Sequence, residues 1–220
     1  MNKYTVYENP SAQICILQLQ GEHERKLIES ELDILKSRVA ASEFCLLTIR
    51  VDDWERELSP WEAPSPFGDG TFGSGANHKL CEILNEIIPD FEKRHPNPDR
   101  KYYLTGYSLA GLFSLWAAYE CDKFEAVAAV SPSVWYPDWS EFISKNQCKA
   151  KKVYLSLGNK ESMTRNKTVS VVKENIMLQH ETLEMAKIKT VLEWNEGNHF
   201  ANVAERMSNG IIWLLETIPD

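Results

Sequence analysis

The sequence lacks the features that mark several classes of protein. Its 24 Lys and Arg residues are outnumbered by 32 Asp and Glu residues, and no basic run or stripe offsets the net charge of −8. This balance argues against a surface for nucleic acid or for anionic membranes. No apolar stretch approaches membrane-spanning length, and the opening MNKYTVYENPSAQ lacks the basic start and apolar core of a secretory signal. We therefore expect a cytoplasmic protein that binds neither nucleic acid nor membrane.

The sequence has no closely paired cysteines, no cofactor fingerprint and no cluster of metal ligands. The five cysteines, an odd number without close pairing, are typical of free thiols in a reducing compartment. The segment Gly68–Gly73 fits the string G-x-G-x-x-G, but it lies far beyond the predicted strand that ends at Val51. A dinucleotide fingerprint must follow its strand directly, so we interpret this match as accidental. We expect neither a cofactor nor a metal.

What the sequence does contain is the composition and periodicity of an ordinary globular protein. With 220 residues, 43% of them hydrophobic and 25% charged, residues 1–220 are expected to form one domain. Strand-like runs occur at residues 4–7, 14–19, 44–51, 102–105, 126–130, 153–157 and 191–194. Helical spacing occurs at residues 27–39, 80–91 with a late interruption at Pro89, 112–119, 168–185 and 203–215. This alternation predicts an α/β fold with a mostly parallel central sheet, helices on both faces and no separate lid domain.

One stretch organises the rest of the chain. The run YYLT at residues 102–105 enters GYSLAG at residues 106–111 and leaves as a helical pattern, with Ser108 at the apex. A sharp turn between strand and helix exposes a serine hydroxyl and crowds the residues two positions away, which must therefore be small, as Gly106 and Ala110 are. The alternative is that Ser108 only caps a helix, since serine is a preferred N-cap residue. The strand before Ser108, the helix after it and the partners described next favour a nucleophile.

The partners of this serine are expected just beyond other strands, because ligands bind outside the carboxyl ends of a parallel sheet. The order Ser108, Glu161, His199 is the order of nucleophile, acid and histidine in an α/β-hydrolase. His199 is predicted to act as the general base, and Glu161 is predicted to orient it. His23, which also follows a strand end, is either the fallback base or a pocket residue. If the acid belongs at position 159 instead, Asn159 leaves a Ser-His dyad.

The remaining site predictions concern the oxyanion hole and the pocket. The backbone N–H of Leu109 follows the nucleophile, and a second donor is expected from Glu22, in the loop after the second strand. The loop of residues 52–77 is rich in aromatic residues and is expected to wrap a pocket, with Trp54, Tyr107 and Trp135 contacting the substrate. Arg56 either meets a substrate anion or pairs with a nearby carboxylate.

The segment GYSLAGLFSLWAAYECDKFEAVAAVSPSVWY resembles the nucleophile region of the putative-esterase branch of the α/β-hydrolases, which includes siderophore trilactone esterases and esterase D-like enzymes. The segments RELSP at residues 56–60, LGNKE at 157–161 and GNH at 197–199 resemble the same branch. The resemblance implies a serine hydrolase with Ser108 and His199 catalytic and Trp135 beside the site. The chain departs from the family pattern at Ala110, in the oxyanion loop and at Asn159.

Together these patterns predict a serine esterase that cleaves a small-molecule carboxylic ester through an acyl-enzyme on Ser108. A second hypothesis is a catalytically weak α/β-hydrolase scaffold used for ligand binding or protein interaction, since a fold does not fix a function. A third is acyl transfer to an acceptor other than water. The sequence leaves the substrate and the oligomeric state open.

Overall fold

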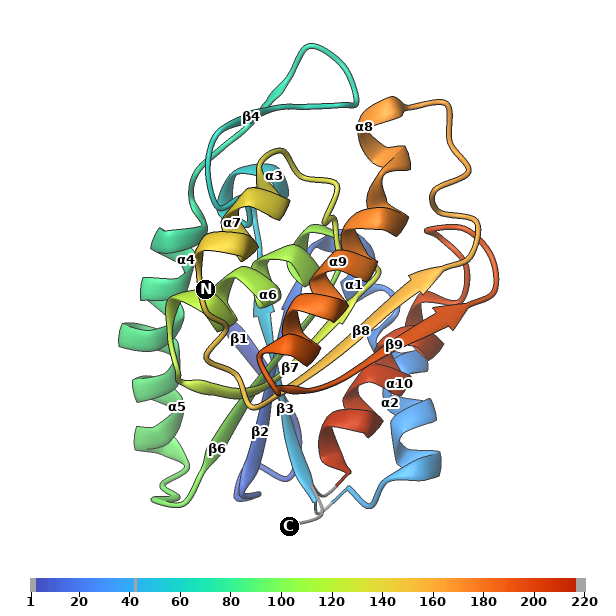
Figure 1. Cartoon of the computed structure of the whole chain (residues 1–220). Coiled ribbons are helices and arrows are strands. Elements are labelled where there is room, and N and C mark those ends of the chain that lie inside the picture. The colour runs from blue at the N-terminus through green and yellow to red at the C-terminus, as the bar shows by residue number, and fades with distance from the viewer. Residues whose placement is uncertain (1–2, 42, 217–220) are drawn as a thin grey trace.

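A sheet of seven strands forms the centre of the molecule (Figure 1). The computed structural model describes residues 3–41 and 43–216. The strands follow the order β1-β3-β2-β6-β7-β8-β9, in which β1 runs antiparallel to β3 and every other neighbour is parallel. Their bounds are β1 (Tyr4–Glu8), β2 (Ile14–Gln20), β3 (Phe44–Arg50), β6 (Lys101–Tyr107), β7 (Phe124–Val130), β8 (Lys152–Gly158) and β9 (Lys189–Asn195). Each of the seven predicted strands is present.

Helices cover both faces of this sheet. They are α1 (Glu22–Arg25), α2 (Ile28–Arg38), α3 (Trp54–Glu57), α4 (Ala76–Glu82), the π-helix η1 (Ile83–Ile87), α5 (Ile88–Arg94), α6 (Leu109–Glu120), α7 (Trp139–Lys145), α8 (Lys167–Ser170), α9 (Val172–Met185) and α10 (Val203–Leu215). Buried side chains from α4 to α7 and from α9 pack on one face, and those of α2 and α10 pack on the other. The short strands β4 (Ala63–Pro64) and β5 (Thr71–Phe72) pair within the loop after β3.

The inner strands β2, β3, β7 and β8 are largely apolar because both of their faces are covered. In β2, Cys15, Leu17 and Leu19 face the cluster beneath α4 to α7, while Ile16 faces α2. This two-sided burial explains why the sequence shows continuous apolar runs in place of strict alternation.

The helical segment before β6 differs from its prediction. Pro89 does not interrupt it: the helical backbone runs from α4 through η1 into α5, and Pro89 sits in the first turn of α5. A proline has no N–H to donate and crowds the carbonyl four residues earlier. The wider π-helical turn directly before it gives that carbonyl room, so the helix continues. Helix α7 was not predicted either, because only seven residues form it.

The strand order places a switch in winding direction between β2 and β6. The chain moves outward from β2 to β3, then returns past β2 to β6 and continues in the opposite direction to β9. Ligands bind beside such a point, outside the carboxyl ends of the strands.

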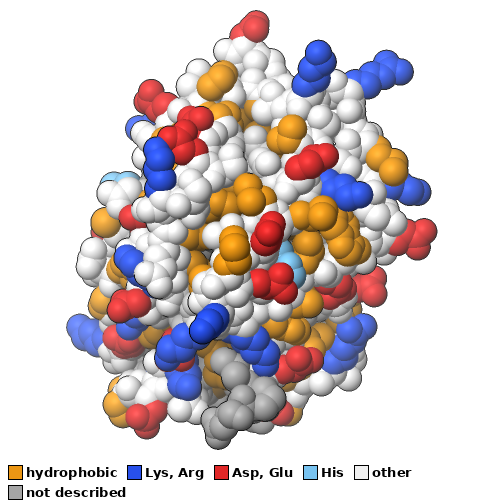
Figure 2. All heavy atoms as spheres, viewed as in Figure 1, with side chains coloured by type: hydrophobic (Ala, Val, Ile, Leu, Met, Phe, Trp, Pro, Cys, Tyr) orange, Lys and Arg blue, Asp and Glu red, His pale blue; other side chains and the backbone are white. Residues whose placement is uncertain are grey.

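The surface of the molecule carries acidic and basic side chains interspersed over the face shown in Figure 2. Within the two described ranges, none of the helices is long and apolar enough to cross a membrane.

Candidate active site

Ser108 joins β6 to α6 in a strained turn. Its backbone has φ 57° and ψ −119°, a conformation that costs a non-glycine residue about 1–3 kcal/mol. Hydrogen bonds hold the turn in place: its N–H donates to the carbonyl of Val130 at 3.0 Å, and its carbonyl accepts from the N–H groups of Leu112 and Ser133, both at 3.0 Å. Neighbouring segments thus hold the hydroxyl at the carboxyl edge of the sheet.

The crowding around this turn explains the small residues of the motif. A Cβ added to Gly106 would lie 2.5 Å from the backbone carbon and oxygen of Ala110, closer than any real contact. Position 111 is less crowded, since a Cβ added to Gly111 would lie 3.0 Å from the carbonyl oxygen of Gly106. Ala110 is fully buried and fits with its own methyl group. The strict glycine requirement therefore falls on position 106, and alanine at position 110 is compatible with the turn.

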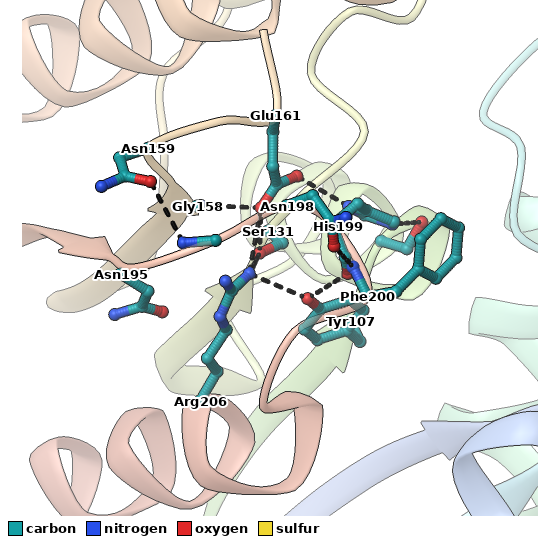
Figure 3. Close-up of polar contacts among 12 residues, drawn as sticks. Tyr107, Ser131, Gly158, Asn159, Glu161, Asn195, Asn198, His199, Phe200 and Arg206 are labelled. Atoms are coloured by element: carbon teal, nitrogen blue, oxygen red, sulfur yellow. Dashed lines mark hydrogen bonds and ion pairs between the residues drawn. The ribbon is translucent and has the colours of Figure 1, made fainter. Parts of the chain in front are cut away.

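His199 lies in the loop between β9 and α10, and its ring faces Glu161 (Figure 3). Its Nε2 is 2.9 Å from Ser108 Oγ, and its Nδ1 is 2.7 Å from Oε2 of Glu161. The hydroxyl of Tyr107 donates to the backbone carbonyl of His199 at 2.7 Å, and the Tyr107 ring packs against the imidazole at 5.2 Å between centroids. With Nδ1 donating to the carboxylate, Nε2 is free to accept the serine proton.

Glu161 follows β8 and is almost fully buried. Its Oε1 accepts hydrogen bonds from the backbone N–H of Gly158 at 2.7 Å, from Ser131 Oγ at 2.8 Å and from Nη1 of Arg206 at 3.1 Å. Burial by itself would raise the pKa of this carboxyl. The hydrogen bond and charge of His199, with the Gly158 and Ser131 donors, outweigh burial and hold the pKa below its ordinary value.

Asn159, the alternative position for an acid, does not face the imidazole. Its side-chain oxygen accepts a hydrogen bond from the N–H of Gly197 at 3.1 Å, and its own N–H donates to the carbonyl of Asn195 at 2.8 Å. The carboxylate beside the imidazole of His199 therefore comes from Glu161. Asn159 instead links the loop after β8 to the loop that carries His199.

A cavity of about 400 Å3 opens over the serine. Its floor includes Ser108 and His199, and its walls are mostly apolar, with contributions from Phe67, Pro132, Trp135, Met163, Val172 and Phe200. Phe67 comes from the long loop after β3 and meets Trp135 edge to face at 5.7 Å between centroids. The carbonyl of Pro66 accepts a hydrogen bond from Asn166 Nδ2 at 2.7 Å, which joins this loop to the start of α8 over the cavity.

Residues 28–202 match the family model described as Putative esterase. The chain belongs to this family. Together with its mostly parallel sheet, membership places the protein in the putative-esterase branch of the α/β-hydrolase superfamily, as an esterase. Within residues 3–41 and 43–216 no separate lid domain is evident. None of the curated proteins compared with the chain matches it.

Solved structures share the fold of this esterase. The IroE-like serine hydrolase of Shewanella oneidensis matches with a TM-score of 0.78 at 19% identity, over 98% of this chain and 77% of its own. The siderophore hydrolase EstA of Aspergillus nidulans matches with a TM-score of 0.71 at 21% identity, over 94% and 84%. The enterobactin esterase FES of Shigella flexneri matches with a TM-score of 0.72 at 15% identity, and the present chain covers 54% of the length of FES.

The structure brings some predicted pocket residues of the esterase to the serine and leaves others elsewhere. Trp135 lines the cavity. Tyr107 does not line it, and its hydroxyl instead donates to the backbone carbonyl of His199. Glu22 and Trp54 line a second cavity of about 440 Å3 beside the ends of β2 and β3. Arg56 packs against the loop glycines, where a Cβ on Gly73 would lie 2.8 Å from its Cγ. Neither Glu22, Trp54 nor Arg56 lines the cavity over Ser108.

Leu109 is the first residue of α6, where it lies directly after the serine. The first N–H groups of a helix have no acceptor within the helix. The Leu109 N–H is one of these groups. Its role as an oxyanion donor stays a prediction.

Two residues of the site were missed by the sequence predictions. Ser131 follows β7 with φ 44° and donates to Glu161, and Arg206 reaches the same carboxylate from α10. Arg206 stands among apolar residues of that helix, between Val203 and Met207, and this position on an otherwise apolar face was the only sequence signal for it. Across the described ranges, no group of three or more His, Cys, Asp or Glu side chains could hold a metal ion.

Proposed function

We propose that the esterase cleaves a carboxylic ester through an acyl-enzyme on Ser108, with His199 as general base and Glu161 as the group that orients it. The observation that supports this most directly is the pair of contacts at the imidazole, 2.9 Å to Ser108 Oγ and 2.7 Å to Glu161 Oε2. Both lie within the range that a base and its orienting group need.

The chemistry follows from these contacts. As Ser108 Oγ attacks the ester carbonyl carbon, its proton passes to Nε2 of His199, and Glu161 stabilises the imidazolium through Nδ1–H. When the tetrahedral intermediate collapses, the bond from carbon to the alcohol oxygen breaks and the alcohol leaves with the proton from Nε2. Water then attacks the acyl-enzyme by the same proton transfers in reverse, releasing the carboxylic acid and Ser108.

The oxyanion of the tetrahedral intermediate needs donors held in place before it forms. The N–H of Leu109 is suited to this role because it lies at the start of α6, where the helix dipole adds a partial positive charge. Glu22 remains the predicted source of a second donor. Its carboxylate, which pairs with Lys26 at 3.2 Å, can only accept hydrogen bonds, so the donor would be its backbone N–H.

The cavity supports a small ester with an apolar group beside the reacting carbonyl. A volume of about 400 Å3 is at the small end of the range for ligand sites, about 300–1,000 Å3. The wall of Phe67, Trp135, Met163 and Phe200 offers carbon surface, and Lys160 adds a cation at the cavity. The siderophore hydrolases among the structural neighbours share this fold, but the lining residues define only an apolar ester, and this is the substrate class that we propose.

The test is hydrolysis of p-nitrophenyl esters of increasing acyl length by the wild type and by Ser108→Ala and His199→Ala. We expect each variant to lose at least about 10³-fold in kcat/KM, because nucleophile and base act as one unit. Ser133→Ala is the matched control, since Ser133 Oγ lies 3.4 Å from Ser108 Oγ but makes no hydrogen bond to His199 among the described residues. We expect it to stay within about ten-fold of the wild type, as a side chain outside the relay should.

The same assay separates the other hypotheses. A wild type that is no faster than Ser108→Ala would contradict the esterase and favour a binding scaffold. Faster release of p-nitrophenol with added alcohols, with ester as product, would identify acyl transfer. A cytoplasmic location stays a prediction, supported by the five free cysteines.

A further inference from the structure

Arg206 projects from α10 and reaches the carboxyl ends of four neighbouring strands. Figure 3 shows its contacts with Tyr107, Ser131 and Glu161. Its Nη1 donates to Tyr107 Oη at the end of β6 at 3.2 Å, to Ser131 Oγ after β7 at 3.3 Å and to Glu161 Oε1 after β8 at 3.1 Å. Its Nη2 donates to the carbonyl of Glu196 after β9 at 2.9 Å. One guanidinium thus contacts every segment that supports the relay from Glu161 to Ser108.

The backbone around this guanidinium is shaped to admit it. A Cβ on Gly158 would lie 3.0 Å from Arg206 Nη2 and 2.6 Å from the carbonyl of Gly197. Gly197 itself has φ 102°, which favours glycine. The two glycines let the loops after β8 and β9 close over the arginine, whose side chain is only 2% exposed.

The buried carboxylate of Glu161 has two partners that can carry a positive charge, His199 and Arg206. The side chain of Glu161 is 5% exposed, so its negative charge costs several kcal/mol unless a partner compensates it. His199 is a partner only while it is protonated, which the proposed mechanism requires only briefly. Arg206 is always charged and contacts the oxygen that His199 does not use.

We propose that Arg206 is a positioning residue that keeps Glu161 ionised and turned toward His199 throughout the reaction, an inference that rests on the proposed function. The arginine occupies Oε1, so Oε2 is the oxygen left for the imidazole. The second link runs through Tyr107, whose hydroxyl contacts Arg206 and donates to the His199 carbonyl. Both the acid and the backbone of the base are therefore held by the same guanidinium.

Removing the charge has a defined consequence. Without Arg206, Glu161 Oε1 loses a permanently charged partner 3.1 Å away, and the pKa of the buried carboxyl is expected to rise. A protonated carboxyl donates to Nδ1, which leaves the proton of the neutral imidazole on Nε2, the nitrogen that must accept from Ser108. Activity should then fall most at low pH.

Other titratable groups face this arginine from the elements packed against it. Tyr107, from β6, and Tyr154, from β8, have pKa values raised by burial and stay neutral. Tyr154 donates to Glu193, from β9, at 2.8 Å, which keeps that carboxylate occupied. From α10, Glu205 is exposed, and from the loop after β8, Lys160 is exposed. Glu161 is the carboxylate that contacts Arg206, so the pH response is expected there.

The experiment uses Arg206→Met and Arg206→Gln, which remove the charge, Arg206→Lys, which keeps it, and Glu205→Gln as an exposed control on the same helix. The first readout is the ¹³C NMR titration of the Glu161 carboxyl, assigned with Glu161→Gln, which needs no turnover. We expect the titration of folded Arg206→Met or Arg206→Gln to move up by at least about one pH unit, as loss of a contacting charge should. Lysine should restore it to within about half a unit.

The second readout is the pH profile of kcat and KM, measured on enzyme whose concentration of active sites has been determined by active-site titration. We expect the charge-removing variants to lose about 10–100-fold in kcat at pH 6 and clearly less at pH 9, with KM within about two-fold because Arg206 does not line the cavity. A Glu161 titration that is unchanged in either folded variant, or an equal loss of kcat at every pH, would overturn the proposal. An inert wild type would instead overturn the proposed function, and the carboxyl titration would still report on Arg206.

Discussion

Replacing Glu161 by glutamine tests how the imidazole is oriented, because the change keeps the size of the side chain and removes its charge. One oxygen of Glu161 accepts from the Gly158 N–H at 2.7 Å and from Arg206 Nη1 at 3.1 Å, and both groups can only donate. The amide oxygen of glutamine must therefore take this position. Its amino group is left facing Nδ1 of His199, at the place where the carboxylate oxygen now lies 2.7 Å away.

The magnitude follows from the tautomer that this arrangement imposes. An amino group donates to Nδ1, so the ring proton moves to Nε2, and Nε2 can no longer accept the proton of Ser108. The same inversion in a serine protease lowers kcat by about 10⁴-fold, equivalent to about 5.5 kcal/mol of transition-state stabilisation. We expect a loss of about this size for Glu161→Gln, with KM almost unchanged.

The assay is steady-state hydrolysis of p-nitrophenyl butyrate between pH 5 and pH 9. Glu196→Gln is the matched control, because Glu196 is an exposed residue of the His199 loop whose backbone, but not side chain, contacts Arg206. A loss smaller than about ten-fold in Glu161→Gln would refute the orienting role. Recovery of activity in the double variant Glu161→Gln, Asn159→Asp would refute it too, since the acid would then belong at position 159.

Three further predictions concern the turn, the core and the cavity. Gly106→Ala should lower the free energy of unfolding by about 1–3 kcal/mol in urea, because the new methyl group would lie 2.5 Å from the Ala110 carbonyl; an unchanged midpoint would contradict this contact. Burial raises the pKa of Glu31 to about 7, against the opposing hydrogen bond from Gln18, while the unfolded carboxyl titrates near 4.5. The folded state therefore holds the proton more tightly, and the free energy of unfolding should fall as pH rises from 4.5 through 7, by up to roughly 3 kcal/mol. Glu31→Gln should abolish that slope in urea unfolding, and a slope equal to that of the wild type would rule out Glu31 as its source. Trp135→Ala should raise KM for butyrate esters by about ten-fold while kcat for acetate esters stays similar, unless the acyl group binds away from this wall.

The strands of the central sheet could be predicted from the sequence because their hydrophobic pattern is strong. Two-sided burial gives β2, β3 and β8 continuous apolar runs, and these were predicted within one or two residues. The π-helical turn at Ile83–Ile87 was not, because its side chains keep an ordinary helical pattern and only backbone hydrogen bonds distinguish it. Short-range pattern alone cannot anticipate that Pro89 is tolerated there.

The site divides in the same way. Ser108, Glu161 and His199 each follow a strand in a turn-rich segment, so topology alone predicts that they approach one another. Arg206 lies on a helix, where an arginine is usually solvent exposed, and its burial depends on the two glycines that let the loops close over it. The aromatic loop after β3 has no periodicity, which is why Trp54 could not be assigned to the correct cavity from the sequence.

The central claim, that Ser108 is an activated nucleophile, is tested most directly by intact-mass measurement after reaction with a fluorophosphonate. We predict one adduct per chain in the wild type, located on Ser108 by peptide mapping, and none in Ser108→Ala. We also predict much slower labelling in His199→Ala, because the serine then lacks its base. A wild type that stays unmodified, or an adduct that persists in Ser108→Ala, would contradict the account.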